Sequence, residues 1–271
     1  MPFPTPSPLP PKALIGMVHV RALPGSPAHE GESIESIAEA AAKEARTLAD
    51  LGFDALIIEN MHDRPYVHGD ALGPEVVSAM TRVGLEVARA VDLPLGVQIL
   101  SGGNRQAIAV AKTIGASFIR CENFVFAHVA DEGLLAKAEA GELLRYRKSI
   151  GAGDVAIFAD VKKKHASHAI TGDVTLADCV HAAEFFGADG VIVTGAATGR
   201  PTDPTHVGQA RAATELPVLV GSGVTPERVP ILLEHADALI VGSALKRDGL
   251  WSNPLDPARG QAMVAAVRAA R

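Results

Sequence analysis

A strand-and-helix unit that recurs along the chain is the feature that most constrains its fold. Nearly continuous apolar runs alternate with segments whose apolar residues recur at helical spacing. Such runs are typical of parallel strands that are covered on both faces. The eight runs lie in residues 13–20, 51–60, 95–100, 114–123, 155–161, 186–195, 218–223 and 235–244. Eight alternating units predict a single (β/α)8 TIM barrel of the α/β class, with an open doubly wound sheet as the alternative.

The segments between the apolar runs carry helix start and stop signals. Pro226 and Pro257 directly follow Thr225 and Asp256, which is the usual order of an N-cap and a first-turn proline. Glycines suited to a left-handed C-cap precede three of the apolar runs. We therefore expect helices over residues 33–51, 75–91, 104–114, 133–150, 174–186, 204–214, 226–235 and 256–270.

The composition indicates one well-cored domain and argues against two classes of partner. Of the 271 residues, 48% are hydrophobic, and the formal net charge is −6. This acidic balance argues against a nucleic-acid surface, because phosphates require clustered Lys and Arg, and the one basic cluster, 162–164, is too short to line a groove. The apolar runs are all shorter than the roughly 18 residues that cross a bilayer, so we expect no integral membrane segment.

The N-terminus and the cysteines suggest how the chain is organised and where it works. Residues 1–12 are rich in proline and lack the apolar centre of a signal peptide, which predicts a disordered tail before a barrel domain at 13–271. Cys121 and Cys179 belong to no framework of paired cysteines. We interpret both as reduced and the location as cytoplasmic.

Polar residues gather at the C-terminal ends of the predicted strands, where barrels of this class carry their active sites. These ends hold His19, Glu59, Asn60, Gln98, Glu122, Asn123, Asp160, Lys162 and Thr194. Two loops rich in glycine, proline and polar residues, 61–74 and 196–206, are candidate lids. The candidate substrate-binding residues are Asn60, Asn123, Thr194 and Arg200.

The last two predicted strands both end in Gly-Ser. Gly221, Ser222 and Gly223 follow the seventh strand, and Gly242 and Ser243 follow the eighth. Glycine allows a ligand to approach backbone N–H groups, and a helix start nearby favours an anion. Because the two strands are neighbours in a barrel, we expect their ends to form one phosphate-binding site. Two ordinary tight turns are the alternative.

Five titratable strand-end residues are candidates for catalysis, namely Asp160, Lys162, Glu59, His19 and Glu122. Asp160 or Glu59 would remove a proton next to a carbonyl group, and Lys162 or His19 would donate one. Strand alternation puts Asp160 and Lys162 on one face, and Lys162 is an alternative Schiff-base lysine. For Glu59 and Glu122, a buried ion-pair network is an equally good interpretation.

The neighbouring charged residues are interpreted as structural or solvated. Arg120 is expected to form a buried ion pair inside the barrel, and Lys163 and Lys164 to be solvated loop charges. Asp160 and His165 are candidate ligands of a divalent metal, because oxygen and imidazole groups suit Mg²⁺, Mn²⁺ or Zn²⁺. A compact motif such as His-Glu-x-x-His does not occur, so the sequence assigns no cofactor.

Four segments carry a family resemblance, which extends from about residue 13 to the end of the chain. "IGMVHVRALPGSP" (15–27), "ENMHDRPY" (59–66), "GVQILSGGNRQAIAVAKTIGASFIRCENF" (96–124) and "DVKKKH" (160–165) resemble the BtpA/SgcQ family. The resemblance implies a barrel of the ribulose-phosphate-binding type. The family's cyanobacterial namesake is associated with thylakoid membranes and photosystem I accumulation. The resemblance therefore also implies an alternative role as a non-catalytic factor in membrane-complex biogenesis.

Two functions of different classes follow from these observations. The first is an enzyme that isomerises, epimerises or cleaves, as a lyase of the aldolase type, a small phosphorylated sugar-like metabolite. The second is the non-catalytic biogenesis factor. We favour the enzyme, because a binding factor does not require acids, a lysine and two glycine turns around one opening. We also expect a phosphorylated small-molecule partner and a homo-oligomer.

Overall fold

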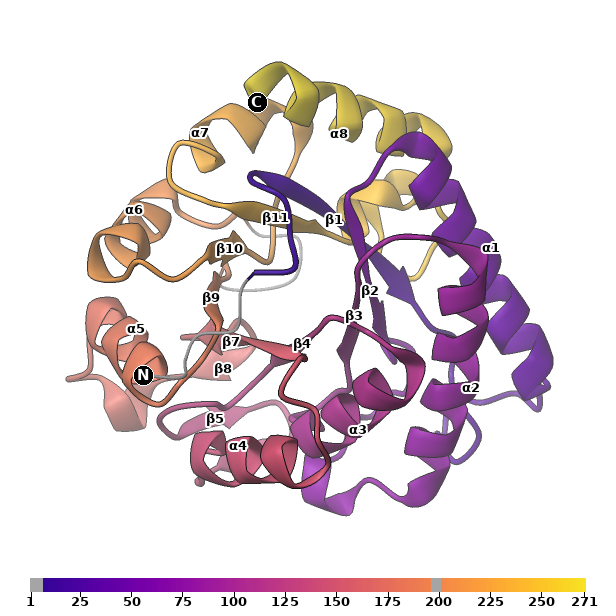
Figure 1. Cartoon of the computed structure of the whole chain (residues 1–271), viewed down its shortest axis with the longest axis horizontal. Coiled ribbons are helices and arrows are strands. Elements are labelled where there is room, and N and C mark those ends of the chain that lie inside the picture. The colour runs from indigo at the N-terminus through magenta and orange to yellow at the C-terminus, as the bar shows by residue number, and fades with distance from the viewer. Residues whose placement is uncertain (1–6, 196–200) are drawn as a thin grey trace.

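The computed structural model describes residues 7–195 and 201–271 and shows a closed parallel barrel. The order around the barrel is β1-β11-β10-β9-β7-β4-β3-β2, and every neighbouring pair is parallel (Figure 1). Its strands are β1 Ala13–His19, β2 Ala55–Glu59, β3 Leu95–Gln98, β4 Phe118–Cys121, β7 Ala156–Val161, β9 Gly190–Val193, β10 Val218–Val220 and β11 Ala238–Val241. The predicted (β/α)8 TIM barrel is confirmed.

Helices surround the barrel and connect its strands (Figure 1). They are α1 Ile34–Leu51, α2 Pro74–Ala90, α3 Asn104–Ile114, α4 Ala140–Ser149, α5 Leu176–Phe185, α6 Pro204–Ala213, α7 Val229–Leu232 and α8 Pro257–Ala270. The helix expected over 226–235 is instead a 3-10 turn, Pro226–Arg228, followed by the single turn of α7. Pro230 lies in this turn and lacks the N–H that a longer helix would use.

A small antiparallel sheet, which the sequence did not predict, lies in the loops that follow β4 and β7. It consists of β5 His128–Ala130, β6 Gly133–Leu135 and β8 Ala166–Ser167, in the order β6-β5-β8. The expectation of a helix from residue 133 was therefore wrong over its first part, and α4 begins only at Ala140. Two- and three-residue strands leave too short a pattern to be distinguished from loop.

Apolar side chains fill the barrel interior at its N-terminal end. Phe118 and Phe158 stack there with ring centroids 5.2 Å apart. Gly96 and Gly190 are required beside them, because a Cβ at either position would lie within 3 Å of a phenylalanine ring atom. This layer closes the barrel at one end, so a ligand can enter only from the other.

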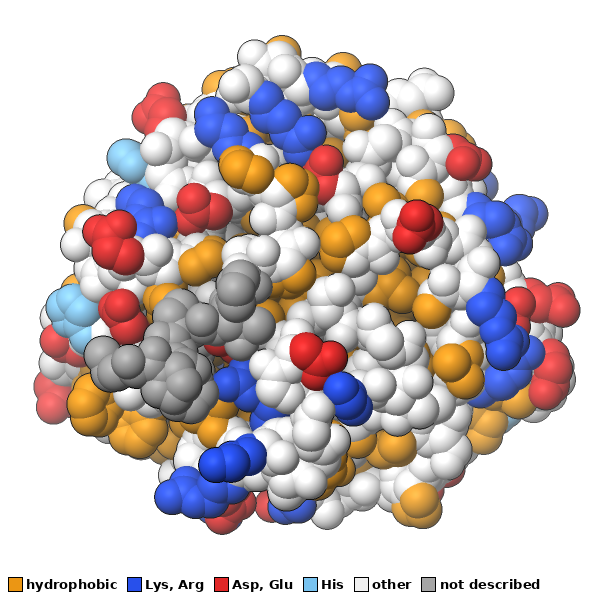
Figure 2. All heavy atoms as spheres, viewed as in Figure 1, with side chains coloured by type: hydrophobic (Ala, Val, Ile, Leu, Met, Phe, Trp, Pro, Cys, Tyr) orange, Lys and Arg blue, Asp and Glu red, His pale blue; other side chains and the backbone are white. Residues whose placement is uncertain are grey.

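Residues 7–12 lie across the N-terminal end of the barrel, which faces the viewer in Figure 1. Leu9 packs against the inner apolar layer, and Lys12 Nζ donates a hydrogen bond to the Ala270 carbonyl at 3.0 Å. The expectation that all of residues 1–12 stand outside the fold therefore fails for residues 7–12. On this face, charged side chains lie mostly around the periphery, with hydrophobic atoms nearer the middle (Figure 2).

Candidate functional site

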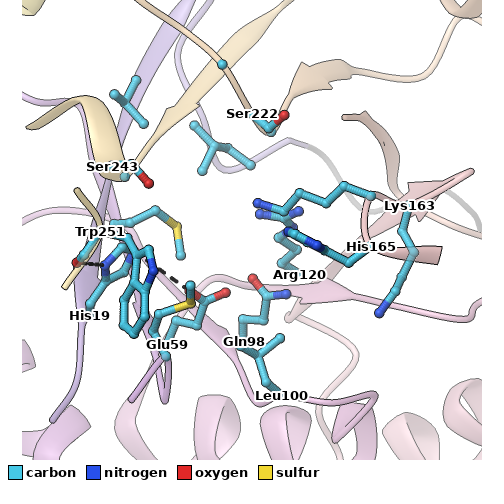
Figure 3. Close-up of a pocket in the computed structure, with 18 of the residues that line it drawn as sticks. His19, Glu59, Gln98, Leu100, Arg120, Lys163, His165, Ser222, Ser243 and Trp251 are labelled. Carbon is cyan, nitrogen blue, oxygen red and sulfur yellow. Dashed lines mark hydrogen bonds and ion pairs between the residues drawn. The ribbon is translucent and has the colours of Figure 1, made fainter. Parts of the chain in front are cut away.

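A cavity of about 490 Å³ opens at the C-terminal ends of the barrel strands. Its size is within the range of pockets that bind small metabolites. Figure 3 shows Ser222 and Ser243 along one side, Glu59 and Gln98 opposite them, and Arg120 between. The cavity therefore lies at the rim where the sequence predicted the functional residues.

The five predicted phosphate-binding residues, Gly221, Ser222, Gly223, Gly242 and Ser243, all line this cavity. Among the residues that the structure describes, the backbone N–H groups of Gly223, Ser243 and Ala244 donate to no protein acceptor. The Ser222 Oγ accepts a hydrogen bond from Gly195 N–H at 2.8 Å. Backbone amides are thus donors that this end offers to an anion.

An arginine that the sequence reading missed reinforces this end of the cavity. Arg259, from the first turns of α8, lines the cavity, and its Nε donates to the Ala244 carbonyl at 2.8 Å. That hydrogen bond holds the guanidinium beside the end of β11. A cation next to free amide donors makes this side of the cavity electropositive.

His19 and Glu59 end adjacent strands and are paired in register, so both side chains enter the cavity from one edge. His19 Nδ1 lies 3.1 Å from the Trp251 carbonyl oxygen, which can only accept, so we assign the ring proton to Nδ1. His19 Nε2 then carries a lone pair and lies 3.9 Å from Glu59 Oε2 (Figure 3). The pair is positioned to accept and donate protons.

Burial shifts the pKa values of these two groups in opposite directions. It lowers the pKa of His19 to about 3, with help from the Lys246 charge, so the imidazole is neutral near pH 7. It raises the pKa of Glu59 to about 6, although the charges of Arg120 and Lys164 oppose that shift. Glu59 therefore changes its protonation state close to neutral pH, as a general acid or base requires.

Asp160, predicted to be catalytic, does not line the cavity. Its carboxylate binds Arg120, with Oδ2 3.0 Å from Nη2 and Oδ1 3.2 Å from Nε. The side chain of Asp160 is only 1% exposed. Strand alternation gives the face of a side chain but not its depth, so the sequence pattern did not show that Asp160 stops short of the cavity. Arg120 does form the expected ion pair, and it also reaches the cavity.

The positions of the three consecutive lysines relative to the cavity also differ from the prediction. Lys162 has φ 46°, and this left-handed conformation ends the strand alternation directly after Val161. Lys162 consequently lies outside the cavity, where its charge acts on Asp178 and Cys179 of α5. The cavity is instead lined by Lys163 and Lys164, for which the sequence predicts solvated positions in the loop.

Glu122 lines the cavity as predicted, and it is fully partnered there. Its Oε1 accepts from Lys163 Nζ at 3.0 Å, and its Oε2 accepts from Gly102 N–H at 2.9 Å. Burial alone would raise the pKa of Glu122, but the Lys163 ammonium and the Gly102 N–H bring it below its usual value. Glu122 is therefore an ionised carboxylate at neutral pH, and it holds Lys163 in place.

The predicted substrate-binding residues in the described part of the chain have structural contacts instead. Asn60 Oδ1 accepts from Leu100 N–H at 2.7 Å, and Asn123 Nδ2 donates to the Lys137 carbonyl at 2.6 Å. Thr194 Oγ1 accepts from the Lys164 N–H at 2.9 Å. None of these three residues lines the cavity. Arg200 lies outside the described residues.

The candidate metal ligands are not brought together. Asp160 binds Arg120, whereas His165 Nδ1 lies 4.0 Å from Asp131 Oδ2. Among the residues that the structure describes, no three His, Cys, Asp or Glu side chains form a group that could hold a metal ion.

Two buried polar atoms of the cavity wall have no hydrogen-bond partner within residues 7–195 and 201–271. They are Gln98 Oε1 and Ser101 Oγ. Buried polar atoms are nearly always paired, so these two mark places where a bound molecule is expected to supply the partner. The sequence placed Gln98 at the rim without a role. Ser101 lies in the loop after β3, where no sequence signal identifies it.

The cavity also contains the single tryptophan of the chain. Trp251 lies in the segment between β11 and α8, and the Arg64 guanidinium lies 4.7 Å from the centroid of its ring. His62 contacts the same ring, with centroids 5.0 Å apart. The loops after β2 and β11 thus meet over one side of the opening.

Solved structures with the same fold include enzymes that are named for different reactions. The orotidine 5'-monophosphate decarboxylase of Methanocaldococcus jannaschii superimposes with a TM-score of 0.60 at 13% identity, covering 95% of this chain and 98% of that chain. The thiamine phosphate pyrophosphorylase of Pyrococcus furiosus gives a TM-score of 0.58 at 12% identity, covering 95% and 96%. At these identities the likeness concerns the fold alone.

Sequence relatives are considerably more similar. A mitochondrial protein of Caenorhabditis elegans that is named only as uncharacterized is 43% identical over 251 residues, which is 91% of this chain and 89% of the worm protein. The photosystem I biogenesis protein BtpA of Synechocystis sp. is 38% identical over 255 residues, or 94% and 87% of the two chains. Within the described residues, no helix is long and apolar enough to span a membrane. The sequence model of the BtpA family matches residues 10–269, and the chain belongs to that family.

Proposed function

We propose that this protein is an enzyme that isomerises, epimerises or cleaves a small phosphorylated sugar-like metabolite. One observation carries the proposal. Gly223, Ser243 and Ala244, whose N–H groups have no acceptor among the described residues, line the same cavity as the titratable pair His19 and Glu59. A phosphate group and a reacting carbon of one small molecule would therefore be held at opposite sides of one opening.

The phosphate side would supply binding energy and orientation. Amide donors and the Arg259 guanidinium are fixed before the ligand arrives, so little reorganisation is needed on binding. Energy gained from a phosphate that takes no part in the reaction can position the reacting carbons. The same anchor would exclude unphosphorylated analogues.

The opposite side would transfer protons. Glu59 in its ionised form would remove a proton from the carbon next to a carbonyl group, and the neutral His19 would accept or relay one through Nε2. Arg120 lines the cavity between these groups and the phosphate side, where its charge would stabilise the oxygen of an enolate. Gln98 would hydrogen-bond a substrate hydroxyl or carbonyl group.

The names of the structural neighbours give modest support. Thiamine phosphate, orotidine 5'-monophosphate and phosphoribosyl anthranilate appear in the names of enzymes with this fold. The alternative, a non-catalytic role in photosystem I biogenesis, rests on the name of the Synechocystis relative. We favour the enzyme, because a biogenesis factor does not account for unpartnered buried atoms in a cavity of metabolite size.

Ligand-induced stabilisation tests the phosphate site. The melting temperature would be measured with inorganic phosphate, ribose 5-phosphate and ribose, and quenching of Trp251 fluorescence would report binding at the cavity itself. A ligand at 100 times its Kd should stabilise the fold by about 2.7 kcal/mol. We expect the two phosphate compounds to bind and ribose not to bind.

Two variants give the test its control. Ser243→Glu places a negative charge in the phosphate side and should abolish binding of both phosphate compounds. Ser252→Glu adds the same charge at an exposed position outside the cavity and should bind as the wild type does. Equal stabilisation by ribose, or unchanged binding by Ser243→Glu, would refute the phosphate site.

A further inference from the structure

We propose that Lys164 is a Schiff-base lysine that attacks the carbonyl carbon of the substrate. The inference rests on the proposed function and narrows it to phosphorylated aldehydes and ketones, and to chemistry of the aldolase type. The geometry, and not the sequence pattern, singles out this lysine from its two neighbours.

Backbone geometry brings Lys164 to the cavity. The left-handed turn at Lys162 redirects the chain at the end of β7, and the Lys164 N–H then donates to Thr194 Oγ1 at the end of β9. A non-glycine residue in this conformation costs about 1–2 kcal/mol, so the rest of the structure must hold the turn. Strain of this kind is concentrated at functional sites. The turn therefore sets the position of the Lys164 backbone, from which its side chain extends.

Of the two lysines that line the cavity, Lys164 is the one whose amine has no partner among the described residues. Lys163 is tied to Glu122 at 3.0 Å, and Lys162 lies outside the cavity. Lys164 lines the cavity, and across the described residues its Nζ makes neither an ion pair nor a hydrogen bond. Partly burying an amine that has no acceptor is unfavourable for a structural side chain and suits one that reacts with a ligand.

The surroundings of Lys164 favour the neutral amine that a nucleophile requires. Burial and then the nearby Arg120 guanidinium lower the pKa of its ammonium group, against the opposing charge of Glu59. A lysine that is desolvated beside a second cation is a known route to a nucleophilic amine. Lys163, which is paired with a carboxylate, has its pKa raised and stays protonated.

The reaction balances with the groups present. Neutral Nζ adds to the carbonyl carbon, and a proton then passes from the nitrogen to the former carbonyl oxygen, which gives a neutral carbinolamine. Protonated Glu59 donates a proton to the carbinolamine oxygen, and water leaves as the C=N bond forms. The resulting iminium accepts the electron pair when the adjacent C–H or C–C bond breaks. Reprotonation of the enamine carbon and addition of water release the product and restore the lysine.

Reductive trapping tests the proposal in the full chain. The protein would be treated with glycolaldehyde phosphate and sodium cyanoborohydride, and the adduct located by intact mass and peptide fragmentation. We expect one phosphorylated adduct per chain on Lys164, blocked by excess inorganic phosphate. Unphosphorylated glycolaldehyde should label surface lysines without preference for Lys164.

Variants separate this inference from the proposed function. Lys164→Arg keeps the charge but lacks a nucleophilic amine, and Lys164→Met removes both. Neither variant should therefore form the adduct that inorganic phosphate blocks. Lys162→Met, which changes a residue outside the cavity, should still form it. Trapping that survives both Lys164 variants would refute the lysine assignment. If the wild-type protein binds phosphate but forms no adduct that phosphate blocks, the Schiff base is overturned and the phosphate site stands. If it neither binds phosphate nor forms such an adduct, the proposed function is overturned as well.

Discussion

Arg120 and Asp160 form a buried ion pair inside the barrel, with Nη2 of the arginine 3.0 Å from Oδ2 of the aspartate. Their side chains are only 4% and 1% exposed. Arg120 reaches the cavity whereas Asp160 does not. The carboxylate therefore positions the guanidinium, and its role in any reaction is exerted through Arg120.

Asp160→Asn should reveal this positioning role. Removing one partner of a buried ion pair costs about 3–5 kcal/mol, so we expect a loss of that order in the free energy of unfolding, measured with urea. Affinity for a phosphorylated ligand should fall as well, because Arg120 is released.

The matched control is Asp189→Asn, since Asp189 forms another buried pair with Arg147 at 2.7 Å, away from the cavity. The Asp189→Asn variant should be less stable than the wild type, but its folded form should bind the phosphorylated ligand with wild-type affinity. Equal losses of affinity in both variants would contradict the positioning role.

The raised pKa of Glu59 predicts a pH-dependent contribution to stability. The folded protein holds the Glu59 proton up to about pH 6, whereas a pKa of 4.5 applies to the free side chain. The folded state thus binds more protons between these values, and this residue lowers stability as the pH rises through that window. Glu59→Gln should therefore gain about 2 kcal/mol relative to wild type between pH 4 and pH 7, measured by urea unfolding. Glu234→Gln, at an exposed position, should show a much smaller change. A difference for Glu59→Gln that does not vary with pH would contradict the burial effect.

Gln98→Met should stabilise the fold while weakening ligand binding. Gln98 Oε1 is buried with no partner in the described part of the chain, so replacing the amide by an apolar group of similar size removes an unfavourable burial worth about 1 kcal/mol or more. The same substitution at Gln106 should destabilise, because its Nε2 donates to the Gly69 carbonyl at 2.7 Å. Thermal unfolding and ligand titration measure both effects. A destabilised Gln98→Met variant would mean that the amide already has a structural role.

The packing of Leu9 predicts that residues 7–12 contribute to stability. Leu9 is partly buried against the inner apolar layer, so Leu9→Ala should lower the free energy of unfolding by about 1 kcal/mol. Leu134→Ala, where the leucine is 57% exposed, should stay within about 0.5 kcal/mol of wild type. Identical unfolding curves for Leu9→Ala and wild type would contradict a contribution of residues 7–12 to the fold.

The strand ends show what could be predicted from local pattern. His19, Glu59 and Gln98 end three consecutive barrel strands and are aligned by the register of β1, β2 and β3. Once eight parallel units are recognised, the barrel rule places these ends on one rim. The two Gly-Ser ends could be found for the same reason, and their cavity position agrees with the prediction.

Loop conformation and depth could not be predicted. The left-handed conformation of Lys162 leaves that residue outside the cavity and brings Lys163 and Lys164 to it, and no pattern of polarity signals that turn. Ser101 and Trp251 reach the cavity from loops far apart in the sequence. Such contacts depend on the fold as a whole.

The sequence by itself determined the barrel, its open rim and the residue types at the strand ends, because these follow from periodicities that each segment carries locally. Tertiary structure alone decided that Asp160 is covered by Arg120, that Glu122 forms an ion pair with Lys163, and that the Lys164 amine is left unpartnered among the described residues. The reason is physical. The charge state and reactivity of a buried group depend on which groups surround it in space, and those neighbours come from strands and loops that are distant in the chain.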